Sequence, residues 1–258
     1  MVKLSKAHHE LKIAYLQSRL KELPHGFFST YRGNDVVILF YDPADPRVTH
    51  DRKARYSVRS KRGELYRKQV AEYVELKGQL DALLKEWKAL YRTPPRKIRF
   101  PLRKKRKDPI DRAFFENAVP EQNMIENQHP IHYNGHTLRS KNELVLCQVI
   151  EKMGYEYKNE IRIDFDEFTF FCPDSSIFVP EVEKVILFEI DGAMDKSKYV
   201  SKSYHNTAIC VQNGLVEGKD FVVARIGSSY DINAEQIENL IRGAIEASID
   251  DIEIESAE

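Results

Sequence analysis

Four acidic residues in the second half of the chain have the types and spacing of a metal-binding carboxylate cluster. Asp174 follows Pro173 directly after an apolar segment, and Glu189 and Asp191 come at the end of the apolar run 185–188. Alternate residues of a strand share one face, so Glu189 and Asp191 are expected to point the same way. Glu143 stands earlier, near the start of a helical pattern. Carboxylate oxygens suit Mg²⁺ or Mn²⁺, which can neutralise phosphate charge and activate water for phosphodiester hydrolysis.

Each of these acids also has a purely structural interpretation. An Asp after Pro, as at Asp174, is commonly a turn residue, and Glu143 is typical of a solvated helix face. The functional interpretation therefore depends on the elements that bring the acids together.

The elements around the acids are predicted to follow the order α-β-β-β-α-β-α. A helix is expected over 140–153, ended by Gly154, and strand-like segments follow it. Strands are predicted at 161–165, 168–172, 185–190 and 221–226, and helices at 198–212 and 234–247.

The first ninety residues have a different pattern. A short amphipathic helix is expected within 1–25, and a hairpin is expected from strands over 36–41 and 48–58. Apolar residues then recur at helical spacing over 62–91 without a proline, which predicts one long helix. Its apolar stripe resembles a coiled-coil seam, so either a homodimer contact or an intrachain core would cover it.

The net charge of zero conceals two halves of opposite sign. Residues 1–107 contain 27 Lys and Arg against 11 Asp and Glu, whereas residues 108–258 contain 13 against 29. The basic half favours an acidic partner, most often nucleic acid, although it could also pair with an acidic half of the same or another chain. The proline-bearing basic run 93–107 is either a phosphate-binding linker or a solvated tether.

Composition excludes several classes. With 42% hydrophobic residues the 258-residue chain can bury a core, which excludes a wholly disordered protein. The longest apolar runs, 36–41 and 185–188, are too short for a membrane helix, and the first twenty residues lack the apolar centre of a signal peptide. Three separated cysteines without CxxC spacing favour a reducing cytoplasm over disulfides or zinc. No GxxxxGK[ST] phosphate loop for ATP is present, and no base-reading motif is found.

The order of elements and the acids resemble the PD-(D/E)xK nuclease superfamily. Glu143 on a helix, Pro173-Asp174 and then Glu189 on a strand carry this resemblance. The sequence segments 139–143 and 188–195, followed by Tyr199 and Asn213-Gly214, are similar to segments of uncharacterised bacterial and mobile-element proteins that carry a Glu-His-Phe-Gly motif. The resemblance is strong over 137–226 and extends loosely to 1–92.

The resemblance implies a restriction-endonuclease-like αβββαβ core, preceded by the hairpin and long helix, and a Mg²⁺ (or Mn²⁺) site. Asp174 and Glu189 would be metal ligands, with Glu143 supporting and Asp191 as an additional ligand. In the superfamily, a Lys commonly stands two residues after the third acid, and in this chain that position is occupied by Asp191. The similar proteins have a His at the position that Ile190 occupies here. The basic catalytic role would then pass to Lys202 or His205, with Lys198 as a third candidate; these three are otherwise surface residues of a helix.

These observations predict four regions and a function. The regions are a basic N-terminal part at 1–92, a basic linker at 93–130, a nuclease domain at 131–248 and an acidic tail at 249–258. The expected function is a cytoplasmic, metal-dependent nuclease, endonuclease favoured, acting on DNA in preference to RNA, of phage or mobile-element type. The alternatives are an inactive relative that binds nucleic acid or assembles with partners, and an adaptor that binds only protein. The basic residues expected to contact nucleic acid are Arg55, Arg59, Arg103, Lys104, Lys105, Arg106, Lys107, Arg139 and Lys141.

Overall fold

The chain is mixed α/β and divides into two compact units. The structure is a computed structural model that describes residues 4–31, 35–40, 54–121, 130–228 and 232–254. The N-terminal unit comprises His9–Pro101, and the C-terminal unit comprises the residues up to His8 together with Leu102–Ile254. The range 93–130, expected to be a linker, is therefore divided between the two units at residue 101.

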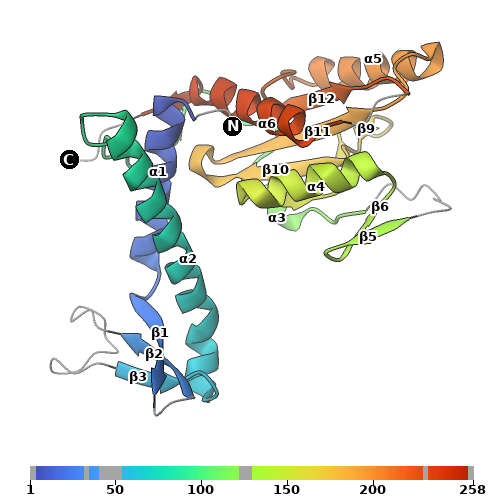
Figure 1. Ribbon diagram of the computed structural model, residues 1–258. Helices are drawn as coiled ribbons and strands as arrows, with labels where there is room; N and C mark the ends of the chain where they lie inside the picture. The colour runs from blue at the N-terminus through green and yellow to red at the C-terminus, as the bar shows by residue number, and fades with distance from the viewer. Residues whose placement is uncertain (1–3, 32–34, 41–53, 122–129, 229–231, 255–258) are drawn as a thin grey trace. The chain divides into compact units, whose positions relative to one another are not determined.

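The N-terminal unit is a three-stranded antiparallel sheet covered by one long helix (Figure 1). The strands β1 (Gly26–Tyr31), β2 (Asp35–Phe40) and β3 (Ala54–Ser57) are hydrogen-bonded in that order, and α2 (Lys61–Leu90) follows. Ile38 and Phe40 of β2 are fully buried against Val70 of α2. The predicted hairpin is present as β2 and β3, and residues 48–53 of the second predicted strand lie outside the described residues. β1 was not predicted because its sequence, GFFSTY, lacks an alternation of apolar and polar residues.

The central part of the apolar stripe of α2 is covered within the chain, while Leu65 and Leu90 near its ends are exposed. Trp87 and Leu80 pack against Ile13, Leu16 and Leu20 of α1 (Lys6–Glu22). Of the two interpretations of the stripe, an intrachain core accounts for its buried residues. The start of α2 needs a glycine, since a Cβ at Gly63 would lie 1.8 Å from the carbonyl oxygen of Ser57.

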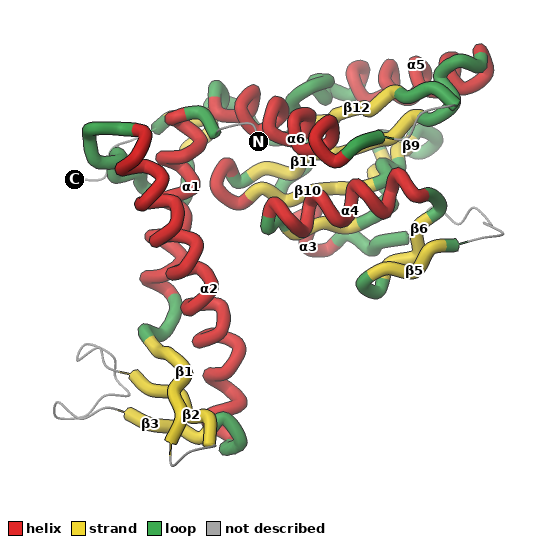
Figure 2. Tube along the Cα trace, viewed as in Figure 1, coloured by secondary structure: helices red, strands yellow, loops and turns green. Residues whose placement is uncertain are grey.

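The C-terminal unit has a four-stranded sheet between two layers of helices (Figure 2). The sheet order is β12 (Phe221–Arg225), β11 (Lys184–Asp191), β10 (Ser175–Val179) and β7 (Glu156–Lys158). β10 is antiparallel to both neighbours, whereas β11 and β12 are parallel and are connected through α5 (Ser197–Gln212). The helices α4 (Lys141–Met153) and α6 (Ala234–Ile249) cover one face, and α5 and α3 (Arg112–Asn117) contribute Cys210 and Phe115 to the core on the other.

Two predicted strands do not join this sheet. The segments expected at 161–165 and 168–172 form a separate hairpin of β8 (Ile163–Asp164) and β9 (Phe170–Phe171). Their places in the sheet are taken by β7 and β10. All five residues of β10 are buried, but its sequence begins with two serines, so it lacked the continuous apolar run that identifies a buried strand.

The beginning of the predicted acidic tail is ordered. Ile249 ends α6, and β13 (Ile252–Glu253) pairs with β4 (Arg103–Lys104), while residues 255–258 lie outside the described residues. The remaining elements are the hairpin β5 (Ile131–Tyr133) and β6 (His136–Leu138) and the short 3₁₀ helix η1 (Pro180–Val182). The three cysteines are free thiols. Within the described ranges, no helix has both the length and the apolar character needed to cross a membrane.

Candidate active site

Asp174 and Glu189 face each other across two antiparallel strands. Asp174 immediately precedes β10, and Glu189 lies near the end of β11, where Ser175 pairs with Phe188. The backbone N–H of Asp174 donates to Oε2 of Glu189 (3.1 Å), and the N–H of Ile190 donates to Oδ2 of Asp174 (2.7 Å). The sheet register therefore brings together two carboxylates that are fifteen residues apart in the chain.

Glu143 and Ser140 cap the start of α4 in a variant of the capping box, in which the Glu143 carboxylate accepts from the residue before the N-cap. The N–H of Glu143 donates to Oγ of Ser140 (3.2 Å), and Oε2 of Glu143 accepts from the N–H of Arg139 (2.8 Å). Oε1 of Glu143 lies 3.1 Å from the Ser140 hydroxyl. Both carboxylate oxygens are engaged in the cap, so Glu143 is placed to support the site and to stabilise the helix that lies beside it.

Ser140→Ala is expected to lower the free energy of unfolding by about 1 kcal/mol, because it removes the side-chain acceptor at the N-terminus of α4. Urea denaturation followed by circular dichroism measures this change. Ser201→Ala, at an exposed position inside α5, is the matched control and should differ from the wild type by only a few tenths of a kcal/mol. Equal stability of the two variants would contradict the capping role.

Arg139 provides the positive charge within the carboxylate cluster. Its Nη2 donates to Oδ1 of Asp174 (2.9 Å) and forms an ion pair with Oε1 of Glu160 at the same distance. Its Nε lies 3.8 Å from Oε1 of Glu143. Arg139 was expected to contact nucleic acid, which stays a prediction; the structure places its guanidinium against Asp174 and Glu160.

The cluster contains more carboxylates than the single positive charge of Arg139 can neutralise. Burial, followed by repulsion from Glu143, raises the pKa of Asp174 to about 7, although the N–H of Ile190 and the guanidinium of Arg139 oppose the shift. Burial and the neighbouring Asp174 raise the pKa of Glu189 well above its ordinary value. Burial likewise raises the pKa of Glu160. A further cation at this position would relieve the repulsion.

These acids open onto a cavity of about 510 Å³. Glu143, Asp174, Glu189 and Asp191 line it together with Lys202 from α5. The structure therefore brings all four predicted acids to one cavity, and the alternation of β11 places Glu189 and Asp191 on the same side, as expected.

The donor set fits a divalent cation that keeps part of its water shell. Among the residues that the structure describes, no three His, Cys, Asp or Glu side chains are already grouped around a common point. Asp174 and Glu189 are adjacent carboxylates, and Mg²⁺ is commonly bound through one or two carboxylates with water in its remaining positions. Asp174 and Glu189 are thus the residues able to hold such an ion.

The basic candidates on α5 are placed differently from one another. Lys202 lines the carboxylate cavity, and its charge lowers the pKa of Glu189 against the larger effect of burial. His205, one turn further on, lines a neighbouring cleft that also contains Lys202 and Glu189. Lys198 is exposed and lines neither space. Of the three, Lys202 is the one that lines the carboxylate cavity.

Much of the basic run 103–107 is paired inside the C-terminal unit. Arg106 donates to both carboxylate oxygens of Asp220 (2.7 and 2.8 Å) and to Asp251 (2.8 Å). Lys105 donates to the carbonyl oxygen of Asp250 (2.7 Å), and Arg103 lies 3.3 Å from the carboxylate of Glu253. These contacts hold the segment 103–106 against Asp220 and against residues 250–253.

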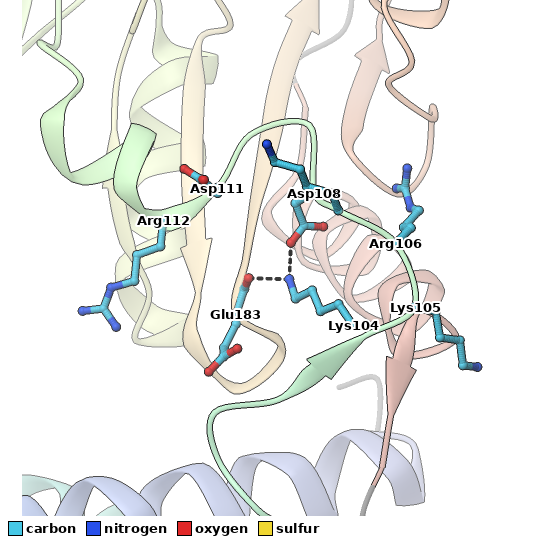
Figure 3. A pocket seen from close by; sticks show the side chains of 8 residues that line it. Lys104, Lys105, Arg106, Asp108, Asp111, Arg112 and Glu183 are labelled. Carbon is cyan, nitrogen blue, oxygen red and sulfur yellow. Dashed lines mark hydrogen bonds and ion pairs between the residues drawn. The ribbon is translucent and has the colours of Figure 1, made fainter.

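Lys104 is also bound internally, beside a cavity of about 600 Å³ (Figure 3). Its ammonium group donates to the carboxylate of Asp108 and to the carbonyl oxygen of Glu183 (2.6 Å). Lys105 points away from these groups. Lys107 also lines this cavity and is exposed.

Other predicted nucleic-acid contacts remain at the surface. Arg55 on β3 and Arg59 just after it are exposed in the N-terminal unit, and Lys141 is exposed at the start of α4. Their accessibility is compatible with phosphate binding.

Two features of the site were missed by the sequence reasoning. Glu160 is buried with a backbone φ of 51° and joins the cluster through Arg139. No periodic pattern marks it, so the sequence offers no signal for its role. The capping box at Ser140 and Glu143, by contrast, is a recognisable spacing of Ser followed three residues later by Glu.

Comparison with known proteins identified no relative of this chain. Neither the protein-family models, nor the curated proteins, nor the solved structures include a significant match to this chain.

Proposed function

We propose that this chain is a metal-dependent nuclease that hydrolyses phosphodiester bonds of DNA or RNA. The observation that carries the proposal is the pairing of Asp174 and Glu189 across β10 and β11, beside a cavity that Lys202 also lines. Two buried carboxylates with raised pKa values form a site that gains stability from a bound cation. Clustered acids of this kind repel a phosphate inside the carboxylate cavity unless a metal neutralises them, whereas basic and aromatic side chains elsewhere on the chain do not need the metal to bind nucleic acid.

The order of elements agrees with the proposal. The helix α4, the sheet strands β7, β10 and β11, the helix α5 and the strand β12 have the αβββαβ order of the PD-(D/E)xK superfamily once the β8–β9 hairpin and η1 are treated as insertions. The acids lie where this order places a nuclease site, at the start of one central strand and the end of its neighbour. This agreement supports membership in the superfamily as part of the proposal.

Each side chain of the site has a role that its position allows. A Mg²⁺ ion bound there would polarise the scissile phosphate and lower the pKa of an attacking water. Asp174 and Glu189 would hold that ion, and Arg139 keeps the carboxylate of Asp174 oriented. Lys202 is placed to pair with a phosphate oxygen or to orient the water.

The N-terminal part supplies the attraction for the polyanion. Even without the run 103–107, much of which is paired internally, residues 1–101 contain 22 Lys and Arg against 11 Asp and Glu. Exposed arginines such as Arg55 and Arg59 can bind phosphates without reading the base sequence.

A second candidate function is that of an inactive relative that binds nucleic acid. The observation that favours it is Asp191 at the position where the superfamily commonly has a lysine. If Lys202 does not replace that lysine, the same fold would bind nucleic acid without cutting it.

Cleavage assays distinguish these functions. The wild type and Asp174→Ala are incubated with circular single-stranded DNA, supercoiled duplex DNA and structured RNA, each with Mg²⁺, with Mn²⁺ and with chelator. We expect metal-dependent cutting by the wild type and no detectable cutting by Asp174→Ala, because the variant loses one of two carboxylate ligands. Asp81→Ala, which removes an exposed acid of α2, should cut like the wild type.

Unchanged cleavage by a folded Asp174→Ala would refute the assignment of the site. Binding without cutting under every metal condition would favour the inactive relative. An adaptor that binds only protein would show no affinity for nucleic acid at moderate salt.

A further inference from the structure

A second cleft adjoins the carboxylate cavity. It has a volume of about 770 Å³ and shares Arg139, Glu189 and Lys202 with that cavity. One wall is the hairpin of β8 and β9, and the other is α5, which lies beside β9 (Figure 1). We call this space the hairpin cleft; the lining residues used below are Phe168, Phe170, Glu189, Lys202, His205 and Asn206.

The hairpin presents an aromatic side chain to this cleft. Phe168, in the turn between β8 and β9, is 86% exposed, the highest value for any large apolar side chain that the structure describes. A ring exposed to this degree at the edge of a cleft is accessible to a planar ligand that stacks on its face. Phe170, next to it, is 48% exposed, and the guanidinium of Arg162 lies 3.9 Å from its ring centre.

The turn that carries Phe168 is held in a fixed conformation. Oδ1 of Asp166 accepts from the N–H groups of both Phe168 and Thr169, each at 2.8 Å. The N–H of Phe165 donates to the carbonyl oxygen of Thr169 (2.9 Å). The backbone of Phe168 is thus anchored while its ring is accessible, so little further ordering of the turn is needed when a ligand stacks on the ring.

The opposite wall supplies polar and charged groups. Lys202 and His205 are exposed one turn apart on α5, and Asn206 follows. The amide of Asn206 has both a donor and an acceptor, which is what the edge of a nucleobase requires. Lys202 contributes a positive charge between this cleft and the carboxylate cavity.

We infer that the hairpin cleft binds an unpaired base of a single-stranded nucleic acid, stacked on Phe168, next to the phosphate that enters the carboxylate cavity. An exposed aromatic ring beside basic side chains is the combination by which proteins bind single strands. The cleft volume falls within the range of about 300–1,000 Å³ of small-ligand sites. A base paired inside a duplex cannot offer its face to the ring. This inference rests on the proposed function and specifies the substrate as single-stranded or locally unpaired.

Binding measured in chelator tests the inference separately from cleavage. The full chain is titrated into a 12-nucleotide single-stranded DNA containing 2-aminopurine and into a duplex of the same sequence, at about 200 mM salt to weaken phosphate contacts. The variants are Phe168→Ala, Phe168→Tyr and Tyr204→Ala. Tyr204 is the matched control because it is 63% exposed on α5 but does not line the cleft.

We expect the wild type to prefer the single strand and to change the 2-aminopurine fluorescence. Phe168→Ala should weaken single-strand binding about tenfold and remove the fluorescence change, since stacking on one aromatic ring has this order of effect. It should leave duplex binding unchanged. Phe168→Tyr keeps the aromatic face and should behave like the wild type, as should Tyr204→Ala.

Single-strand binding and fluorescence that are the same in Phe168→Ala and the wild type would overturn the inference. That result would leave the proposed nuclease activity intact if metal-dependent cleavage is still observed. Conversely, Phe168-dependent binding without any cleavage would support the cleft and refute the nuclease proposal.

Discussion

In chelator at pH 8, Asp174→Asn is expected to be about 2 to 4 kcal/mol more stable to unfolding than the wild type. Asp174 has a folded-state pKa of about 7 because it is buried beside Glu143, whereas an unfolded aspartate titrates at about 3.9. Between these two values the folded protein binds more protons than the unfolded chain. The free energy of unfolding of the wild type therefore falls as the pH rises from about 4 to 7, and an asparagine at position 174 removes that loss.

Urea denaturation at pH 4, 6 and 8 measures this difference, with chelator or with Mg²⁺. Mg²⁺ should stabilise the wild type at pH 8, because an ion that binds only the folded state raises its stability, and it should have no effect on Asp174→Asn. Asp195→Asn is the control. Hydrogen bonds from Ser228 lower the pKa of Asp195, so its loss leaves the slope between pH 4 and 8 unchanged. A wild type with no pH slope and no response to Mg²⁺ would contradict the carboxylate pair as a cation site.

Asp220→Ala is expected to destabilise the C-terminal unit by about 3 to 5 kcal/mol. Asp220 is 2% exposed and pairs with Lys184, which is 3% exposed, and with Arg106. Its Oδ2 also accepts from the N–H of Val216 (2.8 Å). Burial alone would raise the pKa of Asp220, but hydrogen bonds from Arg106 and Lys184 outweigh this effect and lower the pKa below its usual value. Removing the carboxylate would leave the ammonium of Lys184 buried, with Asp108 as its one remaining acidic partner among the residues that the structure describes.

Two further variants separate the buried pair from ordinary surface charge. Glu217→Ala removes a largely exposed partner of Arg225 and should cost less than about 1 kcal/mol. The double variant Asp220→Leu with Lys184→Met replaces the pair by apolar residues and should recover much of the loss, since no unpaired charge stays buried. Thermal and urea unfolding provide the measurement. A cost for Asp220→Ala no larger than that for Glu217→Ala would mean that the buried network does not stabilise the unit.

The helices were predictable because their signals are local. The periodic apolar residues predicted helices over 62–91 and 140–153, the second ended by Gly154, and these correspond to α2 and α4 within one or two residues at each end. The strand β11 was equally predictable from the sequence, because four consecutive apolar residues, 185–188, follow Lys184 and all of them are buried. In each of these segments, the residues that define the element are close together in the chain.

The strand pairing was less predictable because it depends on distant partners. Two serines open β10, yet all five of its residues are buried within the C-terminal unit, where β10 pairs with β11 along its length and with β7 from Ser176 to Phe178. The apolar segment after Asn159 was expected in the sheet, yet it forms the hairpin of β8 and β9 that carries Phe168. Local composition does not distinguish a sheet strand from a short hairpin when both are apolar.

The sequence by itself determined the candidate acids, the division of charge between the halves and the presence of the main helices. Only the tertiary structure decided which charges remain available. It placed Asp174 against Glu189 through the register of β10 and β11, assigned Arg139 to the carboxylates and bound Lys104 and Arg106 inside the C-terminal unit. The physical reason is that a residue's type is a local property, whereas its charge state and its partners depend on burial and on groups far away in the chain.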